Sequence, residues 1–237
     1  MLPWLEWDSA FFGLRLARVT GPTLDSAGAA QALAAGREQR LDCLSLLLSA
    51  SDAASIAAAQ DAGFRLVDLR LALERPSSAP VPPASRGVSI RPQRPDDVSA
   101  LEEIAGEAHR NTRFSRDGRF AAERAADLYR TWIRQECEGG ADQVLVSEQD
   151  GTVTGYVSCH LGAGGLARIG LLGVRSDRRG RGTGRALLAE ALGWFTLADH
   201  MTVNVVTQGH SLAAQRLYQR VGFLTSRLDL WFHLWLT

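Results

Sequence analysis

Lysine is absent from this chain of 237 residues, so all 26 of its basic side chains are arginine. Without a lysine amine, the protein cannot form a Schiff base with a carbonyl substrate or with pyridoxal phosphate. The P-loop is excluded too, because that motif places a lysine directly after its last glycine. Any phosphate ligand must therefore be held by arginine and by backbone groups.

Cysteine is scarce as well: Cys43, Cys137 and Cys159 are widely spaced and odd in number. This argues against a disulfide framework and a structural zinc site, and we expect no metal. No run approaches 18 uninterrupted apolar residues, so we expect no membrane span. The first twelve residues contain Glu6 and Asp8 and no basic region, unlike a signal peptide. We expect a cytoplasmic protein.

A net charge is also missing, since 26 acidic residues balance the 26 arginines. The composition gives no reason to expect nucleic acid or an anionic membrane as a partner. The length is sufficient for one large domain or two small ones. Residues 76–86 contain four prolines among small residues and predict a linker. It would join a small N-terminal α/β domain (1–75) to a larger domain (87–237).

A glycine and arginine loop, Arg178-Arg179-Gly180-Arg181-Gly182-Thr183-Gly184, is the most informative segment. An apolar run at 169–174 predicts a strand before it, and the apolar face of 185–195 predicts a helix after it. Backbone N–H groups at the start of a helix, with arginines beside them, form an anion site. The glycine spacing differs from the G-x-G-x-x-G of dinucleotide-binding folds. An exposed loop that binds nothing is the alternative, and the flanking strand and helix favour the anion site.

Alternating elements are predicted along the C-terminal segment. A short strand at 88–90 precedes a helix that begins at Asp96 or Asp97 and runs to about His109. An irregular arginine-rich stretch at 110–119 leads to a helix at 121–138. Strands at 144–147 and 153–160 form a hairpin through Asp150-Gly151. The predicted order ends with a strand at 167–174, the glycine and arginine loop with its helix, a strand at 203–207, a helix at 211–220 and a strand at 228–236.

The N-terminal segment repeats part of this pattern. A helix, Gly63-Phe64 and a strand fill 55–73, as a helix, Gly222-Phe223 and a strand fill 214–234. Residues 44–48 and 24–40 match the preceding strand and helix. We interpret 1–75 as a degenerate copy of the C-terminal half that lacks the arginine loop. Two unrelated units sharing a common helix ending are the alternative.

The spacing Arg179-x-x-Gly182-x-Gly184 resembles the coenzyme A loop of GNAT-superfamily N-acetyltransferases, and the element order is similar to that of the GNAT fold. The resemblance implies an α/β mixed sheet and acetyl-CoA as co-substrate. It places the coenzyme at Leu172, Gly173, Val174, Arg179, Gly180, Arg181, Gly182, Thr183, Gly184 and Ser211.

The helix at 211–220 resembles the fourth helix of the superfamily, N-x-x-A-x-x-L-Y, with Ser211 in place of the usual Asn. Tyr218 stands at the tyrosine position, and the resemblance implies that it protonates the departing thiolate. A phenol suits this role because it keeps its proton at pH 7. No carboxylate stands out as a base on the strand at 167–174. His109 and His160 are weak candidates, and backbone carbonyls with water are the other route.

A narrower resemblance runs along nearly the whole chain. Four short segments stand in this order: Trp7-Asp8-Ser9-Ala10-Phe11-Phe12-Gly13, Thr112-Arg113-Phe114, Gly118-Arg119-Phe120 and Tyr129-x-x-Trp132-Ile133. In this order they are similar to motifs of the TDP-fucosamine acetyltransferase family. The resemblance implies acetyl transfer to the 4-amino group of a dTDP-4-amino-4,6-dideoxyhexose in surface-glycan synthesis.

A diphosphate acceptor needs cationic donors outside the coenzyme loop. We expect these from the stretch at 110–119, with Arg113, Phe114, Arg116 and Arg119 contacting the substrate. Phe114 and Phe120 would offer flat surfaces. Another small amine or a protein N-terminus as acceptor, and a non-catalytic acetyl-CoA sensor, are the alternatives. The sequence allows a homodimer but does not fix the oligomeric state.

Overall fold

The computed structural model describes residues 2–80, 87–110 and 112–236. In these residues nine strands form one mixed sheet, in the order β1-β2-β9-β3-β8-β7-β6-β5-β4. Residues 81–86 of the predicted linker lie outside the described residues, and the predicted division into 1–75 and 87–237 stays a prediction. No helix in the described part of the chain is both long and apolar enough to cross a membrane.

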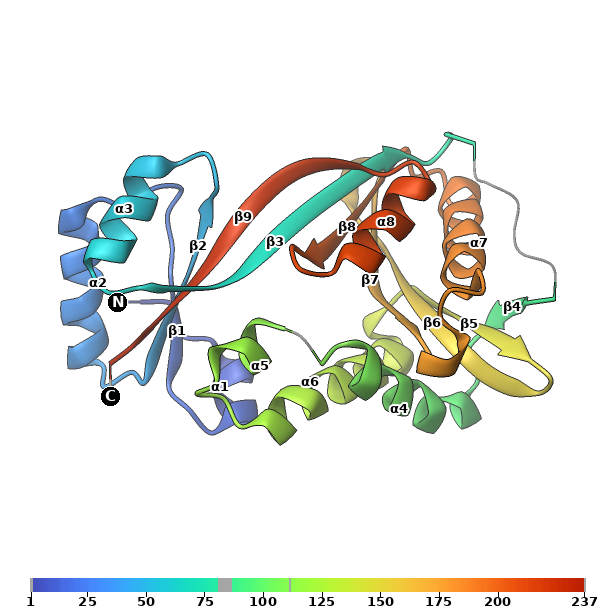
Figure 1. Cartoon of the computed structure of the whole chain (residues 1–237), viewed down its shortest axis with the longest axis horizontal. Coiled ribbons are helices and arrows are strands. Elements are labelled where there is room, and N and C mark those ends of the chain that lie inside the picture. The colour runs from blue at the N-terminus through green and yellow to red at the C-terminus, as the bar shows by residue number, and fades with distance from the viewer. Residues whose placement is uncertain (1, 81–86, 111, 237) are drawn as a thin grey trace.

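The N-terminal half contains three helices and three strands in the described residues. They are α1 (Glu6–Phe12), β1 (Leu16–Val19), α2 (Ser26–Glu38), β2 (Cys43–Ser49), α3 (Ala53–Asp61) and β3 (Arg65–Pro76). Helices α2 and α3 lie together at one end of the molecule (Figure 1). Asp25 and Asp52 cap them, because each carboxylate accepts a hydrogen bond from a first-turn N–H group.

The C-terminal half follows the predicted order of elements, with the short helix α5 (Arg113–Asp117) added between the first two predicted helices. Its elements are β4 (Ser89–Pro92), α4 (Val98–Ala108), α5 (Arg113–Asp117), α6 (Ala122–Gln135), β5 (Gln143–Gln149), β6 (Thr152–Leu161), β7 (Leu166–Val174), α7 (Thr183–Leu197), β8 (Thr202–Gln208), α8 (Leu212–Arg220) and β9 (Leu224–Trp235). The mixed α/β fold predicted from the sequence is confirmed.

The two halves exchange their last strands. Strand β3 of the N-terminal half pairs antiparallel with β8, and β9 of the C-terminal half pairs antiparallel with β2. The two exchanged strands also pair with each other and run side by side between the two ends of the molecule (Figure 1). The parallel pair β1–β2 corresponds to the parallel pair β7–β8. A single sheet thus joins both halves.

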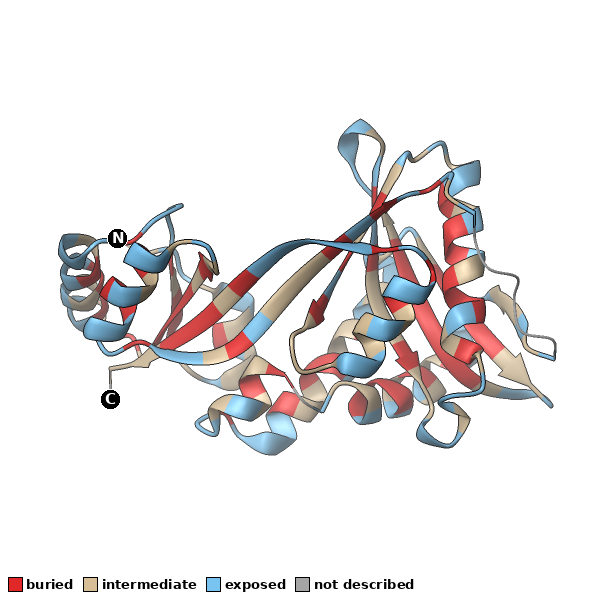
Figure 2. Cartoon of the chain, turned by 45° about the horizontal axis from the view of Figure 1, so that its top comes forward, coloured by how far each residue is buried: buried red, intermediate tan, exposed pale blue. Residues whose placement is uncertain are grey.

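Alternation along the strands sorts the side chains between two faces of the sheet. On β5, Leu145 packs in a cluster with residues of α7, whereas Val144 and Val146 pack with residues of α4 and α6. Three leucines of β2 pack with α2 and α3 in a third cluster. Buried residues gather at these clusters, and the first five residues of β9 are exposed (Figure 2).

The sequence motif at residues 7–13 attaches the N-terminal half to α5 and α6. The Trp7 ring stacks on Phe11 at 5.2 Å and lies 6.1 Å from Trp132 of α6. Phe12 contacts the rings of Phe114 and Phe120 at 4.9 and 4.8 Å. This aromatic cluster fixes the position of α5, whose first residue, Arg113, lines a cavity.

Candidate active site

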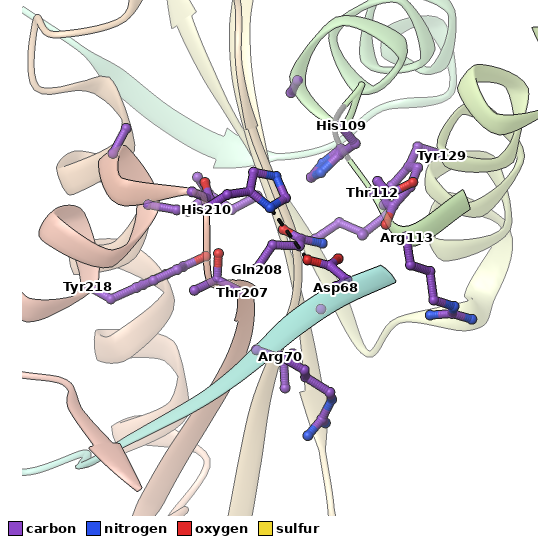
Figure 3. Close-up of a pocket in the computed structure, with 18 of the residues that line it drawn as sticks. Asp68, Arg70, His109, Thr112, Arg113, Tyr129, Thr207, Gln208, His210 and Tyr218 are labelled. Carbon is purple, nitrogen blue, oxygen red and sulfur yellow. Dashed lines mark ion pairs between the residues drawn. The ribbon is translucent and has the colours of Figure 1, made fainter. Parts of the chain in front are cut away.

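A cavity of about 710 Å³ is lined by residues from both halves of the chain. The lining comes from β3 and β9, from the segment α4 to α6, from β7 and the loop after it, and from the segment β8 to α8. Figure 3 shows labelled side chains from β3, from the segment α4 to α6 and from the segment β8 to α8 around one space, with Tyr218 on one side and His109 on the other. The strand exchange therefore brings the N-terminal half into the same site as the C-terminal half.

Strands β7 and β8 separate at this cavity. Their parallel ladder covers only Leu166 to Ile169 on β7, opposite Thr202 to Val205 on β8. Beyond it, residues 170–172 and 206–208 line the cavity. A Cβ atom at Gly170 would lie 2.5 Å from His160 Nε2 and 2.6 Å from Ser158 Oγ, so only glycine fits there. The separation exposes backbone edges of both strands to a ligand.

The predicted anion loop lies at the start of α7. Gly180 and Gly182 have φ angles of +75° and +90°, in the region that favours glycine, and Gly182 is the N-cap residue. The Arg179 Nε donates a 3.0 Å hydrogen bond to the carbonyl of Val174, and its side chain reaches the cavity. The Thr183 hydroxyl is buried without a hydrogen-bond partner among the described residues. This geometry matches a cradle for an anion.

Among the residues predicted to contact the coenzyme, the structure brings Leu172, Arg179 and Ser211 to the cavity. The others follow Leu172 or Arg179 along the chain and do not line the cavity itself. They are Gly173, Val174, Gly180, Arg181, Gly182, Thr183 and Gly184. Ser211 is the N-cap residue of α8.

Tyr218 projects from α8 into the cavity (Figure 3). Its side chain is buried, and the ring packs edge-on against Phe223 at 5.7 Å. Burial raises the pKa of the Tyr218 hydroxyl well above its usual range. The phenol therefore carries its proton at neutral pH, as a proton donor must.

The sequence predicted an irregular stretch at 110–119. The structure differs, because Arg113–Asp117 form the short helix α5. The Ser115 hydroxyl accepts a 2.8 Å hydrogen bond from the backbone N–H of Thr112, which stabilises the first turn. Arg113 at the start of α5 lines the cavity. Its guanidinium lies 4.1 Å from the Phe114 ring and 4.4 Å from the Trp231 ring. Among the described residues no carboxylate forms an ion pair with it.

The other predicted acceptor residues lie elsewhere. Phe114 and Phe120 are buried and pack against each other at 5.1 Å, so neither offers a free face to a ligand. Arg116 and Arg119 line a second hollow of about 680 Å³, on which Asp117 also opens. The four residues expected to contact the acceptor therefore do not line one cavity, because successive residues of a helix point in different directions.

Several residues of the cavity were not predicted. Asp68 and Arg70 come from β3, and His210 directly precedes Ser211. The Asp68 Oδ1 lies 3.4 Å from the His210 Nδ1, and Arg70 contacts Asp229 at 2.9 Å. No short sequence motif shows how β3 pairs with other strands or which of its side chains line the cavity. His210 was detectable only by its place beside the N-cap of α8.

His109 closes the cavity from the end of α4. Its ring stacks on Tyr129 at 4.5 Å, and its Nε2 lies 3.2 Å from the Tyr156 hydroxyl. Burial, aided by the charge of Arg179, lowers the pKa of His109 to about 4. The imidazole is therefore neutral at physiological pH. Within the described residues, no group of three or more His, Cys, Asp and Glu side chains is arranged to hold a metal ion.

Comparisons with known proteins agree with this geometry. Residues 100–223 match the Acetyltransferase (GNAT) family. The dTDP-fucosamine acetyltransferase of Escherichia coli O6:H1 is 29% identical over 97% of this chain and 96% of its own length. The spore coat polysaccharide biosynthesis protein SpsD of Bacillus subtilis strain 168 is 28% identical over 62% of this chain, which is 50% of that protein.

A solved structure shows the same fold. The GCN5-related N-acetyltransferase from Sphaerobacter thermophilus superposes with a TM-score of 0.61 and 23% sequence identity. The superposition covers 81% of this chain and 59% of that one.

Proposed function

The chain belongs to the GNAT family of acetyltransferases, and on this premise we propose that it moves an acetyl group from acetyl-CoA to the 4-amino group of a dTDP-4-amino-4,6-dideoxyhexose. Membership makes the protein an acyltransferase, and enzymes of this family use acetyl-CoA.

One observation carries the proposal: the N-terminal half lines the same cavity as Arg179 and Tyr218. Arg70 comes from β3, which belongs to this half, and Trp231 comes from β9 where it pairs with β2 and β3. The similarity to dTDP-fucosamine acetyltransferase extends over the N-terminal half as well. A shared acceptor class would explain why the similarity covers the N-terminal half, which lines the cavity, as well as the C-terminal half.

The donor side follows from the loop and the separated strands. The pyrophosphate of acetyl-CoA would bind at residues 179–184, where backbone N–H groups and the dipole of α7 favour an anion. Its thioester arm would lie along the exposed edge of β7, towards Tyr218. The acceptor amine attacks the thioester carbon directly, and Tyr218 donates its proton to the thiolate sulfur as the C–S bond breaks.

The acceptor side offers a cation and aromatic faces. Arg113 lies between two aromatic rings, and its planar guanidinium can form paired hydrogen bonds to a phosphate. Tyr129, Trp132 and Trp231 line the same wall and present apolar surface to a base and a sugar. A nucleotide sugar carries both kinds of group.

The test measures the thiol released from acetyl-CoA by the purified full chain over a panel of amines. The panel holds TDP-4-amino-4,6-dideoxyhexoses of both C4 configurations, the same sugars without the nucleotide, amino acids and a peptide N-terminus. The proposal expects the highest kcat/KM for a TDP-sugar and a large loss when the nucleotide is removed. Equal rates for the free sugar, or faster reaction with another amine, would contradict it.

A further inference from the structure

The pair formed by Asp68 and His210 has no role in the proton donation assigned to Tyr218. Both side chains line the cavity, and a dashed line joins them in Figure 3. The Asp68 Oδ1 lies 3.4 Å from the His210 Nδ1, a separation that a bound substrate can shorten. An imidazole oriented by a carboxylate is the arrangement that enzymes use to accept a proton.

The backbone holds the two residues together across 142 positions of the sequence. A register shift in β3 between Leu66 and Asp68 re-aims the chain at Asp68, and the Leu69 N–H donates a 2.9 Å hydrogen bond to its carboxylate. Gly209 packs directly on this strand: its N–H donates a 2.7 Å hydrogen bond to the Leu69 carbonyl. A Cβ atom at Gly209 would lie only 2.5 Å from the Leu69 Cβ. Glycine at 209 thus permits His210 to reach Asp68.

The other candidate bases are less suitable. His109 has a pKa lowered to about 4 by burial, so it holds a proton poorly near neutral pH. His160 does not line the cavity, and its Nε2 lies 2.7 Å from the Glu136 carboxylate. His210 is the one histidine of the described cavity lining that pairs with a carboxylate.

We propose that His210 is the general base that removes a proton from the acceptor ammonium, and that Asp68 positions its ring and stabilises the imidazolium. This inference rests on the proposed acetyl transfer. An ammonium group cannot attack a carbonyl until it loses a proton, so a base in the cavity serves any amine acceptor.

The protons and electrons balance through two groups. His210 Nε2 accepts one ammonium proton, and the freed nitrogen lone pair forms the C–N bond as the C–S bond breaks. Tyr218 gives its proton to the sulfur. After the attack the nitrogen carries two protons, and one of them passes through water to the Tyr218 oxygen, which leaves a neutral amide. The imidazolium then releases its proton to solvent. The sum is an ammonium and a thioester converted to an amide, a thiol and one proton.

Other charged groups line the cavity around His210. They are Arg70 on β3, Arg168 on β7, Arg179 after β7, Glu136 after α6, and Arg113 at the start of α5. His109 and the protonated hydroxyls of Tyr129 and Tyr218 are neutral at physiological pH. Asp68 is the carboxylate in ion-pair contact with His210, and burial raises the pKa of this carboxyl.

The test compares His210→Gln and Asp68→Asn with the wild-type chain, using the amine that the wild type acetylates fastest. The wild type should gain kcat/KM as pH rises between about 5 and 8, where imidazole changes charge. His210→Gln should lose this ascending limb and about 10²- to 10⁴-fold of its kcat at pH 7. Part of that loss should be recovered at higher pH, where free amine becomes abundant. Asp68→Asn should reduce kcat in the same direction by a smaller factor.

Two controls separate a base from a structural residue. Calorimetry should give an unchanged affinity for acetyl-CoA in both variants. His200→Gln replaces a histidine that contacts the carbonyl of Ala198 at 2.8 Å, outside the described cavity lining, and should behave as the wild type. If His210→Gln does not fold, His210→Asn provides the same test.

The inference is overturned if a folded His210→Gln keeps the ascending limb and stays within about threefold of the wild-type kcat. A failure of the proposed function is distinguished by its substrate: the wild type then acetylates another amine and not the TDP-sugar. His210 is in that case tested with the amine that reacts.

Discussion

The guanidinium of Arg113 lies 4.4 Å from the centroid of the Trp231 ring, which joins the start of α5 to the exchanged strand β9. Arg113→Ala should raise the KM for the TDP-sugar while the KM for acetyl-CoA stays unchanged, because it removes a phosphate contact of about 1–3 kcal/mol. Arg116→Ala is the matched control: Arg116 lies on the same helix but lines the second hollow. Equal effects of the two variants on the acceptor KM would contradict the assignment.

Gly182→Asp should weaken acetyl-CoA binding. The substitution puts a negative charge at the N-cap of α7 and forces a side chain into a backbone with φ of +90°. Isothermal calorimetry measures the loss and should give one binding site per wild-type chain. Gly193→Asp is the control, since Gly193 is exposed on the same helix with no atom within 4 Å of an added Cβ. The loop is not the coenzyme site if folded Gly182→Asp binds acetyl-CoA as tightly as the control does.

Tyr218→Phe should lower turnover by about 10²- to 10⁴-fold with little change in acetyl-CoA affinity. The substitution removes only the hydroxyl and keeps the ring that packs on Phe223. Steady-state kinetics and calorimetry together measure both effects. A rate near that of the wild type, when the chemical step limits turnover, would assign the proton donor to another group.

Turns and loops were predictable from the sequence where a short motif marks them. Asp150-Gly151 predicts the hairpin between β5 and β6, and the glycines before α7 predict a loop at its start. The exchange of β3 and β9 was not predictable in this way. Alternation along β3 shows that a strand forms, but it does not reveal that Ala72 pairs with Val206 of β8 and Arg227 of β9.

The residues of the candidate site also differ in whether a short sequence motif marks them. Tyr218 and Arg179 stand in short motifs with fixed spacing, and the structure places both at the cavity. Asp68 and His210 are 142 positions apart, and only the pairing of β3 with β8 and β9 brings them together. The Phe114 ring packs against Phe12 of α1, and the sequence alone does not distinguish a phenylalanine in the core from one in an exposed loop.

Asp97 should make stability depend on pH below neutrality. Arg91 donates hydrogen bonds of 2.7 and 2.9 Å to its two oxygens, and these bonds hold the pKa of Asp97 below the usual range. Because the folded pKa is the lower one, this stabilisation is complete above the unfolded pKa of about 3.9 and is lost as pH falls through the folded pKa. Asp97→Asn should therefore unfold more easily at pH 7, by about 1–3 kcal/mol, with a shallower loss at low pH.

Urea unfolding at several pH values measures this difference. Asp96→Asn is the control, because Asp96 is exposed beside Asp97 and should change stability by less than about 0.5 kcal/mol. Parallel pH curves for the wild type and Asp97→Asn would remove Asp97 from the account of acid stability.

The position of the transferred acetyl group tests the central claim most directly. The full chain is given acetyl-CoA labelled with ¹³C at the acetyl carbonyl and a TDP-4-amino-4,6-dideoxyhexose, and the product is examined by NMR. The account predicts that the labelled carbonyl becomes an amide carbonyl correlated with the proton at C4 of the sugar. Label found only in free acetate, in an ester on a hydroxyl group, or in unreacted acetyl-CoA would contradict it.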